Sequence, residues 1–153
     1  MYLKTRPWLG FFTFIYMKTH YDLSDAQFEE ALKRAILAPQ LFSHEAHLRL
    51  AWLHIKNYGV EKAILNITAQ IKNYTQVLGA DDKYNDTVTV AAIKIVYHFM
   101  QKSVSDNFKD FMLEFPRLKS NFKDILSQHY GFDIFTVAEA KSSYVEPDLL
   151  PFS

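Results

Sequence analysis

Apolar residues recur at spacings of three and four along most of the chain, which is the period of an amphipathic helix. The clearest case spans residues 60–78. There the apolar positions are Val60, Ala63, Ile64, Ile67, Ile71, Tyr74 and Leu78. This pattern predicts a helix over about Glu61–Leu78, which Gly79 ends.

Similar apolar stripes and end signals predict five further helices. Serines precede most of them as N-caps, and Ser24 forms a capping box with Gln27. Glycine or proline follows the expected end of four of these five helices. The predicted ranges are about Asp25–Leu37, His44–Tyr58, Asp86–Lys102, Asp106–Phe115 and Asn121–Tyr130, with Ser43, Ser105 and Ser120 as caps and Pro39, Gly59, Pro116 and Gly131 as stops.

The stretch Asp86–Lys102 is apolar on almost every side, and its β-branched residues would also permit a strand. A helix is favoured because the stretch is long for a strand and no second strand candidate could pair with it. A helix of this kind belongs in the interior of a bundle.

We therefore predict an all-α fold, a single-domain bundle of about six helices over residues 17–153. The segment that begins at Val145 contains two prolines, so we expect an extended C-terminal tail. Leu149, Leu150 and Phe152 indicate that this tail packs on the body of the domain.

Residues 1–16 form a separate apolar region. The run from Trp8 to Met17 is too short to span a membrane as a helix, and no small-residue cleavage site follows it. Two interpretations remain open: an over-extended start, with Met17 as the true first residue, or an N-terminal arm that docks on the domain.

Composition excludes several classes of function. The chain has no cysteine, which rules out disulfides and thiolate chemistry and fits a cytoplasmic location. Acidic and basic residues balance at 17 each, so we expect neither a nucleic-acid nor a membrane partner. No glycine-rich phosphate-binding loop is present.

His44 and His47 are the main candidates for chemistry. At a spacing of three they share one helix face with Leu48, Ala51, His54 and Ile55. They also lie in the first helical turn, where the helix dipole disfavours a protonated imidazole. A neutral histidine can accept a proton, ligate a metal or belong to a small-molecule or anion site. The alternative is an ordinary structural role for both rings.

A divalent metal on His44 and His47 would need further ligands. Candidates come from Tyr84, Asn85 and Asp86, from Glu146 and Asp148, and from His54 and His98. No H-E-x-x-H motif and no repeated E-x-x-H motif is present, so a zinc protease or a di-iron bundle is not indicated.

Three motifs together resemble a family of small bacterial all-helical proteins. They are "FSHEAHLRLA" at residues 42–51, "YNDTVT" at 84–89 and "VEPDLLP" at 145–151. The resemblance implies a helical domain and one shared site, but no activity. Its site residues would be His44, His47, Arg49, Tyr84, Asp86, Thr87, Thr89, Glu146, Pro147 and Asp148. Asn85 departs from the family pattern, which has histidine there, and this weakens the metal interpretation.

These observations predict a histidine-centred pocket for a small polar or anionic molecule. Its walls would be the N-termini of the second and fourth helices and the tail. His44 or His47 would act as base or ligand, and Arg49 would hold an anion. The tail would bring Glu146 or Asp148 to the histidines for proton transfer. A non-catalytic structural bundle and a histidine-ligated metal protein are the alternatives.

Overall fold

The computed structural model describes residues 17–152, and every regular element within that range is a helix, which confirms the predicted all-α class. The α-helices are α2 (Asp25–Lys33), α3 (His44–Tyr58), α4 (Val60–Val77), α5 (Asp86–Met100), α6 (Phe108–Glu114), α7 (Arg117–Ser120), α8 (Phe122–Ser127) and α9 (Ala138–Ser142). Short 3-10 turns are η1 (His20–Asp22), η2 (Pro39–Leu41) and η3 (Asp81–Lys83). The predicted arm or over-extended start, residues 1–16, lies outside the described residues.

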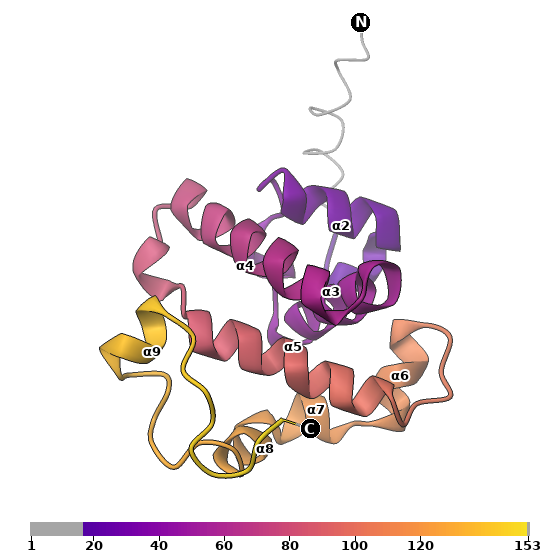
Figure 1. Cartoon of the computed structure of the whole chain (residues 1–153). Coiled ribbons are helices and arrows are strands. Elements are labelled where there is room, and N and C mark those ends of the chain that lie inside the picture. The colour runs from indigo at the N-terminus through magenta and orange to yellow at the C-terminus, as the bar shows by residue number, and fades with distance from the viewer. Residues whose placement is uncertain (1–16, 153) are drawn as a thin grey trace, which may run out of the picture.

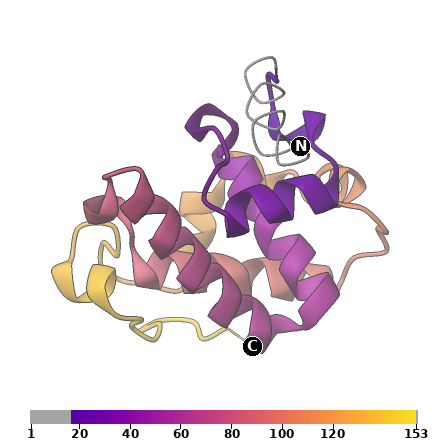
Figure 2. The same ribbon diagram turned by 90° about the horizontal axis from the view of Figure 1, so that it is seen from above.

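Helices α3, α4 and α5 pack against one another and form the centre of the domain (Figure 1). Helix α2 lies over α3 and α4, as the view from above also shows (Figure 2). Helix α9 contacts α5, and Figure 1 places it at the N-terminal end of that helix. Helix α5, which the sequence predicts to be apolar on almost every side, therefore contacts helices from both halves of the chain.

The bounds of α3 match the prediction because strong signals set both ends. The Ser43 hydroxyl accepts a hydrogen bond from the Ala46 N–H, and Gly59 ends the helix with a φ of 86°. That φ lies in the left-handed region, which glycine adopts without a steric penalty. Asn85 begins α5 in the same way by accepting the Val88 N–H.

Helix α2 ends four residues before the predicted Leu37. Ala35 adopts a φ of 56°, and the Ile36 N–H donates to the Ala31 carbonyl, the pattern of a left-handed helix end. An alanine in this conformation gives no sequence signal, so the apolar stripe was extended too far.

Two predicted caps in the second half of the chain are wrong. The Ser105 hydroxyl donates to Glu114, and Asn107 instead caps α6, which therefore begins at Phe108. Ser120 does not cap the last predicted helix, because its hydroxyl donates to the Pro116 carbonyl at the start of α7. The helix predicted over Asn121–Tyr130 is the shorter α8, and α7 before it was not predicted.

The C-terminal tail packs on the body, as predicted, but through backbone contacts more than through its leucines. The Tyr130 hydroxyl donates to the Val145 carbonyl at 2.7 Å, and the Leu149 N–H donates to the His129 carbonyl at 3.0 Å. Leu149 and Leu150 remain exposed, whereas Phe152 stacks on the His129 ring. Helix α9, just before the tail, was not predicted.

A membrane-spanning helix is not found among residues 17–152, since none of their helices combines the required length and apolarity.

Candidate functional site

A mostly apolar cavity of about 820 Å³ lies beside the first turns of α3. Side chains of α3, α4 and α5 form its walls, and residues 119–124 of α7 and α8 close another side. Leu48, Ile71, Val88 and Phe122 are among the apolar lining residues. A cavity of this size is typical of a small-molecule site.

His47 lies in this cavity with its ring held in a fixed orientation. Its Nδ1 is 2.8 Å from the Ser43 carbonyl, and the ring stacks on Phe42 with a centroid distance of 3.7 Å. Many protein atoms surround the His47 side chain, but its surface remains accessible to solvent through the cavity that it faces. Burial lowers the pKa of His47; the Ser43 contact opposes this effect and His44 adds to it. The neutral ring is therefore favoured.

His44 lines the same cavity and is held by a different element. Its Nε2 is 3.0 Å from the Leu118 carbonyl in α7, and its ring lies 5.0 Å from that of Phe122. This contact connects α3 to the wall formed by residues 119–124. His44 and His47 thus both line the cavity.

Tyr84, Asn85 and Thr89 also line the cavity, but their polar groups are engaged by protein. The Tyr84 hydroxyl donates to Asp86, and the Thr89 hydroxyl donates to the Asn85 carbonyl. The Asn85 side chain caps α5 and donates to the Ile134 carbonyl. Burial and the Asp86 carboxylate raise the pKa of Tyr84, so its proton stays in place.

Asp86 and Thr87 belong to the same predicted motif but do not line the cavity. Asp86 accepts the Tyr84 hydroxyl. Thr87 is fully buried and contacts the tail instead, where it donates to the Ser143 carbonyl and accepts the Val145 N–H. Their predicted role in ligand binding is replaced by a structural one.

Arg49 does not contribute to the cavity, which corrects its predicted role as an anion-binding residue. It is 5% exposed and donates to the His20 and Leu23 carbonyls and to Asp25. Five residues separate it from His44 on the helix, a rotation of about 140°, so the two side chains face different directions. Arg49 anchors residues 20–25 to α3.

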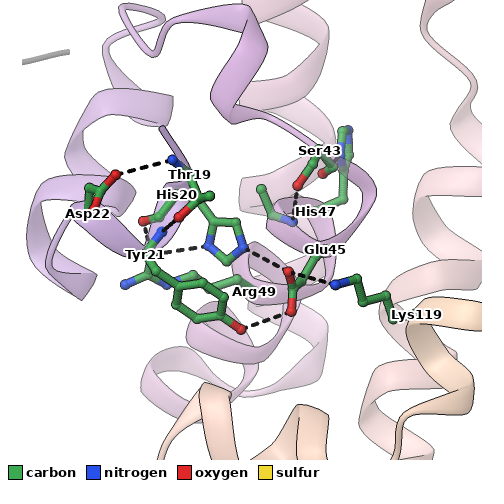
Figure 3. Close-up of polar contacts among 10 residues, drawn as sticks. Thr19, His20, Tyr21, Asp22, Ser43, Glu45, His47, Arg49 and Lys119 are labelled. Carbon is green, nitrogen blue, oxygen red and sulfur yellow. Dashed lines mark hydrogen bonds and ion pairs between the residues drawn. The ribbon is translucent and has the colours of Figure 1, made fainter. Parts of the chain in front are cut away.

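A buried polar cluster next to the cavity was not predicted. Figure 3 shows the His20 ring between Arg49 and Glu45. Glu45 accepts the Tyr21 hydroxyl at 2.9 Å and lies 3.5 Å from both His20 Nε2 and Lys119 Nζ. Glu45 and Arg49 lie four residues apart on α3, and Arg49 pairs with Asp25 instead. Through Lys119, the cluster reaches the wall of the cavity.

The charges in this cluster favour an ionised Glu45 and a neutral His20. Burial would raise the pKa of Glu45, but the hydrogen bond from Tyr21 and the nearby Lys119 and His20 lower it overall. Burial and Arg49 lower the pKa of His20, and Glu45 only partly opposes this. The ionised carboxylate holds Lys119 at the edge of the cavity.

Glu146 and Asp148 do not line the cavity, which corrects the prediction that the tail brings a carboxylate to the histidines. Asp148 accepts the Gly131 N–H at 2.8 Å, and Glu146 accepts the Tyr144 hydroxyl. The tail contacts the start of α5 through Thr87, but it follows residues 128–131 for the rest of its length. Asp148 therefore fastens the tail to the body, whereas the Glu146 contact is local.

The geometry gives no support to a metal site at His44 and His47. Within residues 17–152, no group of three or more histidine, cysteine, aspartate or glutamate side chains is placed to hold a metal ion. Asn85, the nearest counterpart of a third ligand in the predicted motif, uses both side-chain atoms in hydrogen bonds to the backbone.

His54, placed on the same helix face as His44 by the sequence, lies outside the cavity. Ten residues separate the two, which rotates the direction of the side chain by about 80° on an ideal helix. His54 is 1% exposed, and neither ring nitrogen has a hydrogen-bond partner within the described residues. Its nearest ionisable neighbour is Glu29 of α2, at 4.0 Å.

We expect His54→Leu to raise the free energy of unfolding by about 1 kcal/mol at neutral pH, because it removes an unsatisfied buried polar group. Burial lowers the pKa of His54 from 6.5, and Glu29 only partly opposes this. The unfolded chain therefore binds this proton more readily, so wild-type stability falls as the pH drops below about 6.5. Urea unfolding near pH 7 and near pH 5 checks the prediction.

The gain from His54→Leu should be larger at the lower pH, since leucine has no proton to bind. The exposed Asn57→Leu on the same helix is the control for helix propensity. An equal gain at both pH values would contradict the assignment of the effect to protonation of His54.

Comparison of the chain with protein-family models, with curated proteins and with solved structures found no match. The resemblance to a family of bacterial helical proteins remains a prediction.

Sequence reasoning missed the residues that close the cavity opposite α3. Lys119 and Lys123 lie more than seventy positions beyond His47, and Lys83 comes from η3. No periodicity connects them with α3. For Phe42, another lining residue, the sequence did hold a local signal: an apolar residue before an N-cap often packs on the first turns of its helix, as Phe42 does on His47.

Proposed function

We propose that this protein binds a small organic molecule with a largely apolar body and one polar or anionic group. The observation that carries the proposal is the cavity of about 820 Å³ that contains both His44 and His47. Each ring is fixed through one nitrogen by a backbone carbonyl, and its other nitrogen has no hydrogen-bond partner among the described residues. A cavity with few, well-oriented polar groups is the usual form of a small-molecule site.

The ligand differs from the one the sequence predicts in being more apolar. Most of the lining is apolar, and Arg49 is not available to hold an anion. Lysines at the edge of the cavity take that role in the proposal. The absence of cysteine fits a cytoplasmic site of action.

Filling the cavity is expected to weaken binding at least tenfold. Ala92 of α5 lines the cavity and is only partly buried, so Ala92→Trp would place a large ring inside it. Anilinonaphthalene sulfonate, an apolar fluorescent anion, serves as the probe. Its fluorescence should increase saturably with the wild-type protein and much less with the variant.

Leu65→Trp is the matched control, because Leu65 is 69% exposed on α4 and does not line the cavity. Val88→Phe, a smaller change in the same wall, covers the case in which Ala92→Trp does not fold. Equal probe binding by the wild type and all three variants would overturn the proposal. A structural role is the second candidate, since each histidine already contacts a backbone carbonyl; absence of any saturable binding would favour it.

A further inference from the structure

The hydrogen bonds of His44 and His47 determine what each ring offers to a ligand. A carbonyl oxygen only accepts, so the nitrogen that contacts it must carry the hydrogen. His44 therefore donates from Nε2 to Leu118, and His47 donates from Nδ1 to Ser43. In the neutral rings, His44 Nδ1 and His47 Nε2 are left with lone pairs. The pair offers two hydrogen-bond acceptors.

Three other polar side chains of the lining, those of Tyr74, Tyr84 and Asn85, are engaged by the protein. The Tyr74 hydroxyl donates to the Leu37 carbonyl at 2.8 Å, and burial raises the pKa of Tyr74 to about 12. Tyr84 and Asn85 are engaged as described above. The free ring nitrogens are thus the acceptors available at this end of the cavity.

The charged groups that line the cavity are mostly cationic. Lys83 comes from η3, Lys119 from α7 and Lys123 from α8, whereas Asp124 is the one carboxylate in the lining. Neither α4 nor α5 contributes a charged side chain to the lining. Lys119 follows Leu118, the partner of His44, and its ammonium lies 3.5 Å from Glu45 Oε1. This surplus of positive charge favours an anionic ligand.

Resting on the proposed function, we infer that the ligand is an apolar carboxylic acid and that it binds together with one proton. At neutral pH the free acid is a carboxylate, which the lysines attract. A carboxylate oxygen and a ring lone pair are both acceptors, so they can meet only with a hydrogen between them. The solvent supplies this proton, and no covalent bond forms or breaks. An apolar alcohol would bring its own hydrogen and take up no proton.

Calorimetry with decanoate and with decanol tests this inference. Each is titrated into the protein near pH 7.5 in phosphate and in Tris, whose ionisation enthalpies differ, so the difference in heat gives the number of protons taken up. We expect about one proton with decanoate and none with decanol. Decanoate affinity should fall as the pH rises, by up to about tenfold per unit.

Two substitutions remove the basic ring nitrogens, which can take up a proton, and keep a donor for each anchoring hydrogen bond. In His47→Asn the amide NH₂ takes the place of Nδ1, and in His44→Gln it takes the place of Nε2. The double variant should fold, take up no proton and bind decanoate at least tenfold more weakly. His129→Asn is the control, because His129 also donates from Nδ1 to a carbonyl, that of Leu150, and lies outside the cavity.

The outcomes separate this inference from the proposed function. Proton uptake that persists in the double variant, or that is equal for decanoate and decanol, would overturn the inference. Binding of anilinonaphthalene sulfonate without binding of decanoate would do the same and leave the proposed function standing. Failure of every probe to bind would overturn both.

Discussion

Arg49→Met is expected to lower the free energy of unfolding by about 3 kcal/mol, since several buried groups lose their partner at once. The guanidinium donates to the carbonyls of His20 and Leu23, two residues that are 2% and 3% exposed. It also lies over the Phe28 ring at 4.8 Å. Methionine keeps most of the apolar stem, so the change isolates the polar contacts. Urea unfolding followed by circular dichroism measures the effect.

The ion pair with Asp25 should account for little of this loss. Asp25 is 62% exposed at its side chain, and exposed pairs contribute about 0–1 kcal/mol. Asp25→Asn should therefore cost far less than Arg49→Met. Arg34→Met, at an exposed position, is the control for the substitution itself. A decrease of less than about 1 kcal/mol in the free energy of unfolding of Arg49→Met would show that water reaches the His20 and Leu23 carbonyls.

Local signals predicted the elements that carry the site. Ser43 and Gly59 bound α3, and Asn85 begins α5, because capping and glycine geometry depend only on neighbouring residues. The same argument fails at Ala35, where packing imposes a left-handed conformation on a residue that does not favour it. Helix ends were predictable where a side chain specifies them.

The composition of the site was only partly predictable. A spacing of three placed His44 and His47 within one turn, and both line the cavity. Arg49 was misassigned because its role came from the motif alone, although helix geometry turns its side chain about 140° away from that of His44. Lys119 and the buried pair of His20 with Glu45 depend on contacts between distant segments. The spacing of apolar residues along the chain does not predict contacts of this kind.

Thr87→Val is expected to lower the free energy of unfolding by about 2 kcal/mol and to release the C-terminal tail. Thr87 is fully buried, and its hydroxyl donates to the Ser143 carbonyl at 3.1 Å and accepts the Val145 N–H at 3.0 Å. Valine has nearly the same shape, so packing is retained while two backbone groups lose their partner. Those groups can recover hydrogen bonds only by moving into water.

The place where the Thr87→Val chain opens distinguishes a role in attaching the C-terminal tail from a general contribution to stability. Limited proteolysis should cleave Thr87→Val in the segment after Ala140 faster than the wild type, with the rest of the domain protected. Thr89→Val on the same helix is the control, because its hydroxyl bonds within α5 at the Asn85 carbonyl and does not reach the tail. Equal cleavage of the two variants would contradict a fastening role for Thr87. Because neither Glu146 nor Asp148 lines the cavity, ligand binding should survive this release, which would separate the tail from the site in function as well as in structure.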